Sequence, residues 1–249
     1  MSDARLAGIL NGEHRRDPHK ARDRHRHPME LLAFFGLRPD LVVADIWPGS
    51  AGWTTEILAP YLKDHGTYIA VGYDPETETS FDPAPHQAEF IAKVAARPDL
   101  YGAIRHGRVS QQRFDIAADG TVNLILFLRL AHVFARNAAL ERLLMAMFRA
   151  LKPGGILGLT EHRAKPDHPR DVQGLRGYMH QDHVIELARA AGFELDATSE
   201  IKANPLDTAD HPRGVWNLPP WLWGGDEDRA KYLAIGESDR MALRFVKPL

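Results

Sequence analysis

Residues 45–52 carry an acidic side chain and two glycines directly after a short apolar run. They read Asp-Ile-Trp-Pro-Gly-Ser-Ala-Gly, and apolar residues at helical spacing follow them. Glycine lets the backbone approach a ligand closely, and the free N–H groups at the start of a helix favour negatively charged groups. Asp74 stands 22 residues beyond Gly52, just after a second apolar run, where a carboxylate can accept hydrogen bonds from the two hydroxyls of a ribose. The glycine turn and the carboxylate together predict a site for a nucleoside.

Two histidines follow later apolar runs, each near an arginine. Arg129 and His132 come after one run, and Glu161, His162 and Arg163 end another. An imidazole titrates near neutral pH and can take a proton from a bound substrate. We expect His132 to be the general base, with His162 as second candidate and Arg129 in the same catalytic set; a hydrogen-bonded structural role is the alternative for each histidine. The arginines either hold an anionic part of a substrate or cap the local backbone and pair with Glu161.

A long segment near the C-terminus carries further candidates. Residues 203–240 are rich in Pro, Trp and Asp and interrupt the regular pattern, and loops of this length are usually functional or disordered. Several apolar side chains argue against disorder. Its tryptophans form either a flat apolar wall for an aromatic or lipophilic ligand or an anchor to the core. The residues that we expect to contact a substrate are Arg163, Tyr178, His180, Asp207 and Trp216.

The composition limits the chemistry of these residues. The chain has no cysteine, which excludes disulfides, thiolate zinc sites, iron–sulfur clusters and a cysteine nucleophile. His132, Glu161 and His162 are residue types that can bind a divalent ion, but no ligand spacing defines such a site, and we expect no metal. A net charge of −2 creates no field that gathers polyanions. The basic stretch at 15–27 also carries acidic residues and no aromatic ones, so nucleic acid is not an expected partner.

The pattern of apolar residues predicts the frame that positions the candidates. Apolar runs predict strands at 41–46, 67–73, 102–109, 121–127, 156–160, 193–201 and 241–246, and helical spacing predicts helices at 53–62, 86–96, 140–151 and from 184 onward. Helices that alternate with strands imply a doubly wound α/β fold, with a mostly parallel seven-stranded sheet and helices on both faces. Such sheets bind ligands at the carboxyl ends of their strands. The glycine loop, Asp74 and both histidines belong to that edge.

The length of the chain suits one domain. Its 249 residues, 44% of them hydrophobic, can build one sizeable core. We divide it into a helical arm at 1–36 and a main domain at 37–249 with an insertion at about 203–240. The arm is polar all round at 13–27, so it is either a solvated segment or a lid that presents Arg22, Asp23 or Arg26 to the site. No run resembles a signal peptide or the ~20 apolar residues of a membrane span, and we expect a cytoplasmic protein without a membrane partner.

The loop at 45–52 and Asp74 resemble the cofactor site of class I S-adenosylmethionine-dependent methyltransferases, whose loop pattern is Asp/Glu-x-Gly-x-Gly-x-Gly. Two later segments are similar to recurrent turns of that superfamily: Leu-Lys-Pro-Gly-Gly at 151–155 and Ala-Ala-Gly-Phe at 190–193. The resemblance implies S-adenosylmethionine as the cofactor and an antiparallel last strand at 241–246. The cofactor-binding residues that it implies are Asp45, Trp47, Pro48, Gly49, Gly52, Asp74 and Phe127.

More closely, the chain is similar to a family of bacterial predicted methyltransferases with unassigned substrate, and this likeness spans nearly the whole chain. The motifs that carry it are Arg-His-Pro at 26–28, Phe-Phe-Gly at 34–36, Pro-Gly at 48–49 with Gly-Trp at 52–53, Glu-His-Arg at 161–163, Asn-Pro at 204–205 with Asp207, Gly-Val-Trp at 214–216, Leu-Pro-Pro at 218–220 and Ile-Gly-Glu-Ser-Asp-Arg at 235–240. Trp47 and Ala51 depart from the superfamily pattern by replacing the first and third glycines of the loop. Asn123 replaces an aspartate that is common at the start of strand four.

The resemblance implies methyl transfer to a small-molecule acceptor by in-line substitution. In that chemistry the protein aligns the acceptor, and a histidine assists its deprotonation. Two other functions stay open. The departures at 47, 51 and 123 allow a non-catalytic or regulatory S-adenosylmethionine-binding protein, whereas a nicotinamide-dependent oxidoreductase is disfavoured because the loop lacks Gly-x-Gly-x-x-Gly spacing. The sequence decides neither the acceptor nor whether the chain forms a homodimer.

Overall fold

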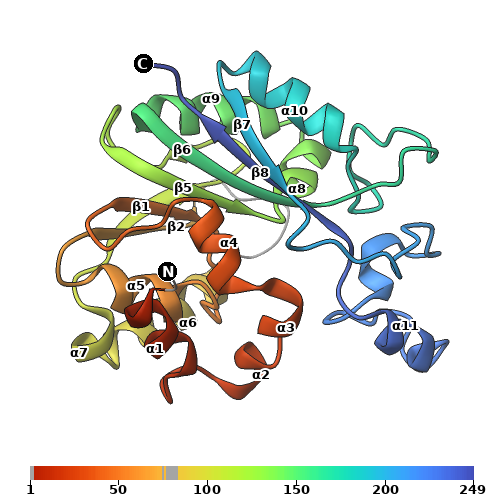
Figure 1. The fold of residues 1–249 in the computed structure, drawn as a ribbon, viewed down its shortest axis with the longest axis horizontal. Helices are drawn as coiled ribbons and strands as arrows, with labels where there is room; N and C mark the ends of the chain where they lie inside the picture. The colour runs from red at the N-terminus through yellow and green to blue at the C-terminus, as the bar shows by residue number, and fades with distance from the viewer. Residues whose placement is uncertain (1–2, 75, 77–83) are drawn as a thin grey trace.

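The computed structural model describes residues 3–74, 76 and 84–249. Eight strands form one sheet in the order β4-β3-β2-β1-β5-β6-β8-β7. The pairs β1–β2, β1–β5, β2–β3 and β5–β6 are parallel, whereas β8 runs antiparallel to both β6 and β7. Figure 1 shows this sheet between two groups of helices. The predicted doubly wound, mostly parallel sheet with an antiparallel last strand is therefore confirmed.

The strands agree with the predicted runs, with one addition. Their bounds are β1 (Val42–Ile46), β2 (Thr67–Tyr73), β3 (Arg105–Val109), β4 (Phe114–Asp115), β5 (Val122–Leu128), β6 (Leu151–His162), β7 (Glu194–Ser199) and β8 (Arg240–Val246). The two-residue β4 pairs antiparallel with β3 and was not expected, so the sheet has eight strands instead of seven. β6 begins at Leu151 because this residue pairs with Val122 across a shift in register.

Helices cover both faces and extend beyond the sheet at each end of the chain. Their bounds are α1 (Ala4–Asn11), α2 (Asp17–Lys20), α3 (Asp23–Arg26), α4 (Pro28–Phe34), α5 (Thr55–Leu62), α6 (Ala84–Ala95), α7 (Pro98–Tyr101), α8 (Ala131–Arg136), α9 (Leu140–Ala150), α10 (Gln181–Ala190) and α11 (Arg229–Ile235), with a 3₁₀ helix at Gly214–Asn217. No described helix is long and apolar enough to cross a bilayer.

Two apolar clusters bury the two faces of the sheet. One contains Phe127 and Phe245 with residues of α8, α9 and α10. The other contains Leu124 with residues of α1, α4, α5 and α7. Parallel strands with near-continuous apolar runs need such burial on both sides. Polar side chains therefore gather at the carboxyl ends of the strands, where the connecting loops meet.

The N-terminal arm and the C-terminal insertion approach each other at that edge. α1 is tied to α5 and the loop after it, because Leu6 is buried there and Arg5 donates to Asp64 Oδ2 at 2.7 Å. Further along the arm, a Cβ on Gly236 would come 2.8 Å from His25 Cε1. Figure 1 shows α2 and α3 on the same side of the molecule as α11. Segments from both ends of the chain thus meet at the carboxyl edge of the sheet.

Candidate active site

Asp45 is the next-to-last residue of β1, and its carboxyl group is buried among hydroxyls. Thr54 Oγ1 donates to its Oδ2, and Tyr68 OH donates to the same oxygen at 3.0 Å. Burial raises the pKa of Asp45 to about 7, and the two hydroxyl donors offset only part of this shift. Gly49 and Gly52 have φ angles of 75° and 59°, which glycine adopts without steric cost. The loop therefore has the tight turn that its glycines predicted.

Trp47 replaces the first glycine of the loop pattern and fills space beside the ends of β2 and β3. Its indole N–H donates to the carbonyl of Val109 at 2.9 Å. Its ring centroid lies 4.7 Å from that of Tyr73 and 4.7 Å from that of Phe134. The backbone of Trp47 has a φ of 47°, a left-handed conformation that is strained for a residue with a Cβ. Trp47 is thus a core side chain as well as a wall of the site.

The other predicted cofactor residues divide between this edge and the core. Asp74 is fully buried at the end of β2. Pro48 lies beside Trp47 at the walls of two small cavities, of about 40 and 10 Å³. Phe127 is also fully buried and belongs to the apolar cluster on the α8 side, whereas Leu128 lines the larger of the two cavities. Successive strand residues face opposite sides, so the cavity is next to Leu128 and not Phe127.

The cavity of about 40 Å³ lies between the loop after β1 and the segment after β5. Arg129, Arg26 and Lys202 bring three cationic side chains to its wall. Arg129 has a φ of 63°, so two non-glycine residues in the left-handed region, Trp47 and Arg129, line the same cavity. Such conformations cost ~1–3 kcal/mol each and cluster at functional sites. The backbone geometry therefore makes this cavity a candidate functional site.

Glu161 at the end of β6 orients His132 at the start of α8. Glu161 Oε1 is 3.0 Å from His132 Nδ1, and its Oε2 accepts from the backbone N–H of His132 at 3.0 Å. Among the described residues, His132 Nε2 has no hydrogen-bond partner. A carboxylate that holds Nδ1–H leaves Nε2 as a proton acceptor. A Cβ on Gly174 would approach His132 Cβ to 2.7 Å and its Cα to 2.8 Å, so the loop before α10 packs against the backbone of His132.

His162 lies beside this pair and is held in its neutral form. Its ring centroid is 5.4 Å from that of His132, and its Nδ1 is 2.5 Å from Ser238 Oγ. Burial, and then the charges of Arg240, His132 and Arg129, lower the pKa of His162 well below its usual value. The structure thus brings together both predicted histidines and Arg129, as the sequence analysis expected of a catalytic set.

His132, Glu161 and His162 also satisfy the geometric minimum for a metal site, with one ligand atom of each within 4.8 Å of the others. Both oxygens of Glu161 are already hydrogen-bonded, because Oε1 also accepts from the His162 backbone N–H at 2.7 Å. The positive charges of Arg129 and Arg240 also lower the pKa of His162. Cations beside a neutral imidazole disfavour a further cation. The geometry favours proton transfer over metal binding.

Asp207 and Tyr178 form a buried network that differs from the predicted substrate contacts. Tyr178 OH lies 3.1 Å from each carboxylate oxygen of Asp207, and His211 Nε2 lies 2.9 Å from Oδ1. The backbone N–H groups of Ala209 and Asp239 donate to the two oxygens at 2.9 and 2.8 Å. Asp207 is fully buried. These contacts fasten the insertion to the sheet, and a contact of Asp207 with a substrate stays a prediction.

The remaining predicted substrate residues line or flank larger cavities. Arg163 and His180 line one of about 550 Å³; Arg163 donates there to Glu200 at 2.7 and 2.6 Å. Trp216 stacks on Trp223 with a centroid distance of 5.4 Å and lies 6.1 Å from the His132 ring. Trp216 is therefore the aromatic residue of the insertion that reaches the histidine pair.

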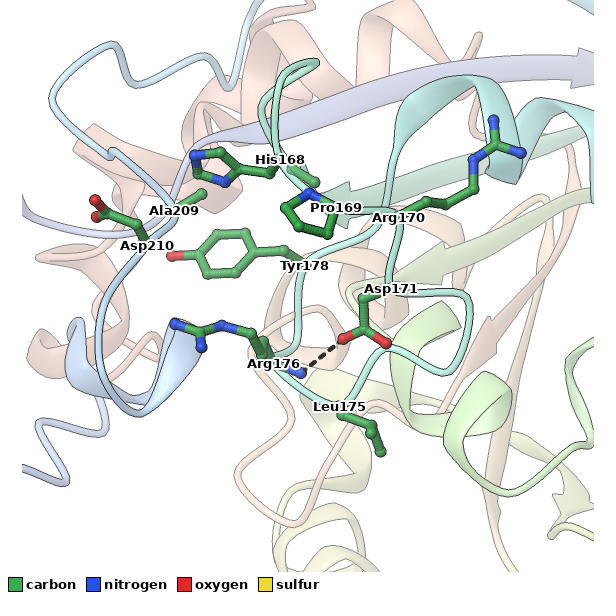
Figure 2. A pocket seen from close by; sticks show the side chains of 10 residues that line it. His168, Pro169, Arg170, Asp171, Leu175, Arg176, Tyr178, Ala209 and Asp210 are labelled. Carbon is green, nitrogen blue, oxygen red and sulfur yellow. Dashed lines mark hydrogen bonds between the residues drawn. The ribbon is translucent and has the colours of Figure 1, made fainter.

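A further cavity, of about 490 Å³, lies in the loop between β6 and α10. Figure 2 shows the Tyr178 ring between His168 and Pro169 on one side and Arg176 on the other. The same ring lies 6.2 Å from that of His162, centroid to centroid. Tyr178 thus separates this cavity from the histidine pair, and the cavity is the space beside the pair that has the size of a small-molecule site.

Four consecutive residues, the three before β8 and its first residue, were missed as site residues, although they were noted as a motif. Glu237 pairs with Arg22, Ser238 with His162, Asp239 with Arg163, and Arg240 with Glu237. Every side chain of residues 237–240 therefore joins the site. The available signal was a run of four polar residues immediately before a buried strand. Lys202 was missed as well, because an isolated lysine in an insertion carries no pattern.

Neither a protein-family model nor the sequence of a curated protein matches this chain. Solved structures do match its fold. The [4+2]-cyclase SpnF superposes with a TM-score of 0.62 at 17% identity, covering 96% of this chain and 86% of that one. A SAM-dependent methyltransferase from Aquifex aeolicus has a TM-score of 0.56 at 13% identity, with 97% and 98% covered.

A third match is phosphoethanolamine N-methyltransferase 2 from Haemonchus contortus, in complex with S-adenosyl-L-methionine. Its TM-score is 0.59 at 16% identity, covering 90% of this chain and 53% of that one. At these identities the likeness shows the fold alone. The chain therefore has the Rossmann-like fold that SAM-dependent methyltransferases share, and a protein that is a cyclase shares it as well.

Proposed function

We propose that this chain transfers a methyl group from S-adenosylmethionine to a small-molecule acceptor. The fold supports this function, as does the position of the glycine loop and Asp74 at the carboxyl edge of the sheet. The observation that carries the proposal is the Glu161–His132 pair at the same edge, 3.0 Å apart, with Nε2 of the imidazole unpartnered among the described residues. That pair supplies a base for an acceptor that must lose a proton.

The residues at the loop fit a nucleoside in their chemistry. Asp74 supplies a carboxylate for ribose hydroxyls, and the turn at Gly49 and Gly52 lets the backbone come close. The two cavities beside Trp47 and Pro48 measure about 40 and 10 Å³, whereas small-molecule sites are ~300–1,000 Å³. Binding a nucleoside therefore requires side chains at this loop to move. When bound, S-adenosylmethionine supplies an electrophilic methyl group.

The protein's own part in the reaction is to align the acceptor and remove its proton. His132 Nε2 accepts the proton, while Glu161 holds Nδ1–H and stabilises the imidazolium that forms. His162 stays neutral beside it because burial and neighbouring cations lower its pKa. It therefore adds no charge that would oppose protonation of His132.

An aromatic or lipophilic acceptor remains our proposal for this site. Trp216 lies 6.1 Å from the His132 ring, and Tyr178 lies 6.2 Å from the His162 ring. Both aromatic faces are thus beside the proposed base, and the cavity of about 490 Å³ adjoins Tyr178. Flat apolar walls of this kind favour a ring or an alkyl group. The small-molecule acceptor is the partner that we propose.

Calorimetric titration with S-adenosylmethionine, S-adenosylhomocysteine and NAD tests the cofactor. We expect both adenosyl ligands to bind the native chain and the Asp99→Asn control, whose carboxylate is exposed and paired with Arg97. Asp74→Asn should weaken both by at least ~10-fold because an amide is a poorer acceptor for ribose hydroxyls. Binding of NAD alone, or of none of the three, would overturn the proposal.

His132→Gln tests the catalytic role, with release of S-adenosylhomocysteine over a panel of aromatic acceptors as the readout. We expect kcat to fall ~10²- to 10⁴-fold, the usual contribution of a general base, while the dissociation constant of S-adenosylmethionine is unchanged. His65→Gln, which changes an exposed histidine in the turn after α5 away from the proposed acceptor cavity, is the matched control. Cofactor binding without turnover by the native chain would favour the regulatory alternative.

A further inference from the structure

Five cationic side chains surround one buried carboxylate where the arm meets the insertion. Glu237 Oε1 lies 2.5 Å from Arg22 Nε, and its Oε2 lies 2.6 Å from Arg240 Nη2 and 3.5 Å from Arg26 Nε. Arg129 and Lys202 belong to the same set of residues, because the negative charge of Glu237 acts on each and partly offsets the lowering of its pKa by burial. We call these six residues the cationic cluster. Its positive charges outnumber its negative charge by a wide margin.

Much of the hydrogen-bonding capacity of the cationic cluster is unused. Arg26 Nε and both Nε and Nη1 of Arg240 are buried without a hydrogen-bond partner. Among the described residues, the side chains of Arg129 and Lys202 make no hydrogen bond or ion pair; only their backbone groups do. Arg26 is 3% exposed and Lys202 is 5% exposed. Buried donor atoms without partners are costly, and an anion would supply the missing acceptors.

Three basic side chains of the cationic cluster face a cavity. Arg26, Arg129 and Lys202 line the cavity of about 40 Å³ behind the glycine loop. One water occupies roughly 10–15 Å³ in such a measure, so the cavity has the size of a few waters or of one carboxylate group. The strained backbone of Arg129, with a φ of 63°, fixes the direction from which its side chain enters.

The surroundings of the cavity disfavour the charged forms of the basic side chains that line it. Burial, together with the neighbouring cations, lowers the pKa of Lys202 well below its usual value and lowers that of Arg129 to about 10. Asp45 lines the same cavity, and burial raises its pKa to about 7. Below that pH the protonated Asp45 neither pairs with the cations nor repels an anion. The cavity therefore favours a negatively charged ligand group.

We propose that this cavity binds a carboxylate of the methyl acceptor, so that the acceptor is an anionic small molecule. This inference rests on the proposed function and names its substrate class. The amino-acid end of S-adenosylmethionine also has a carboxylate, but it brings an ammonium and a sulfonium with it. Those two positive charges would add to the cationic cluster, whereas an anionic acceptor offsets it. Arginine and lysine together bind carboxylates through charge-assisted hydrogen bonds.

Titration in the absence of S-adenosylmethionine tests the inference directly. Benzoate and acetate are the carboxylate probes, with benzamide and acetamide as neutral isosteres, and binding is read from calorimetry and from the shift in melting temperature. We expect the carboxylates to bind and the amides not to bind, with at least a ~10-fold weakening between 50 and 500 mM NaCl. Equal behaviour of acids and amides, or no binding of either acid, would overturn the inference.

Two variants and a control locate the binding site. Arg129→Gln and Lys202→Met should each weaken benzoate at least ~10-fold through the loss of a charge-assisted contact. Arg244→Gln should not, because Arg244 is paired with Asp196 and does not line the cavity. Unchanged benzoate affinity in Arg129→Gln would overturn the assignment. Circular dichroism of each variant distinguishes lost binding from lost folding.

A last comparison tests whether the cavity binds the acceptor or the cofactor. S-adenosylmethionine and 5′-methylthioadenosine differ in the amino-acid end and the sulfonium. If Arg129→Gln weakens S-adenosylmethionine but leaves both methylthioadenosine and benzoate unchanged, the cavity serves the cofactor and the inference is wrong. If carboxylates bind and S-adenosylmethionine does not, the proposed function fails while the anion site stands. The two failures are therefore distinct.

Discussion

Residues 237–240 separate two buried polar regions that differ in how completely their hydrogen bonds are made. On one side, the carboxylate of Asp207 accepts from Tyr178, His211 and two backbone N–H groups. On the other, Arg26 and Arg240 of the cationic cluster keep buried nitrogen atoms without a partner. Both regions join the insertion to the rest of the fold. They are alike in burial and opposite in hydrogen bonding.

That difference distinguishes buried polar residues that stabilise the fold from buried polar residues that bind a ligand. A buried carboxylate with all its acceptor sites used stabilises the arrangement around it. A buried cation with unused donors destabilises the fold, and it persists where a ligand completes the bonds. The sequence analysis placed Asp207 with the substrate and gave Lys202 and Arg240 no role. From their hydrogen bonding in the structure, we propose the opposite role for each, and the variants below test it.

The largest effect on stability is expected from Asp207→Asn. The amide would turn an N–H group toward at least one of the donors that now face the carboxylate, and breaking a buried charged network costs ~3–5 kcal/mol. Urea denaturation followed by circular dichroism measures the loss. Asp210→Asn, whose exposed carboxylate accepts from Thr208, is the control. A loss below ~1 kcal/mol for Asp207→Asn would contradict the structural role.

Asp45→Asn is expected to change how stability depends on pH. The pKa of Asp45 is raised by burial from 3.8 to about 7 in the folded chain, so the folded state binds more protons than the unfolded state between these values. Stability therefore falls as pH rises from about 4 to 7, by ~2–3 kcal/mol between pH 5 and 8 for this group. Asn cannot ionise, so the variant should lack that part of the fall. Parallel pH profiles of the two proteins would contradict the raised pKa.

Arg129→Gln is expected to stabilise the ligand-free chain by ~1–2 kcal/mol while weakening carboxylate binding. Removing a half-buried charge without a side-chain partner lowers the cost of folding, and stability gained at the expense of function is the usual sign of a ligand site. Urea denaturation of the native chain and the variant, without ligand, gives the difference. If the variant is less stable than the native chain, Arg129 belongs with the structural network instead.

The smallest effect is expected from Trp47→Phe. The substitution keeps an aromatic ring beside Tyr73 and Phe134 but leaves the carbonyl of Val109 without the indole donor. A lost buried hydrogen bond costs ~1 kcal/mol, and thermal denaturation of the variant measures it. A much larger loss would show that the shape of the indole ring, more than its hydrogen bond, holds the loop.

The pattern of the sequence predicted most of the sheet, because each buried strand needs a continuous apolar run and each such run is visible. Residues 67–73 match β2, and the strands predicted at 121–127 and 241–246 differ from β5 and β8 by one residue at an end. The two-residue β4 was missed because Phe114 and Asp115 have no periodicity of their own; pairing with β3 makes them a strand.

The residues of the candidate site were predictable from the sequence only where ionisable side chains lie at or just after the end of a predicted strand. The sequence by itself placed His132, Glu161 and His162 at one edge, since loops after parallel strands must meet there. Only the tertiary structure decided that Trp47 fills the space beside β2 and β3, that Asp207 is enclosed, and that Arg26 meets Arg129 and Lys202 in one cavity. Local patterns determine elements, whereas contacts between segments that are distant in the sequence depend on how the whole chain packs.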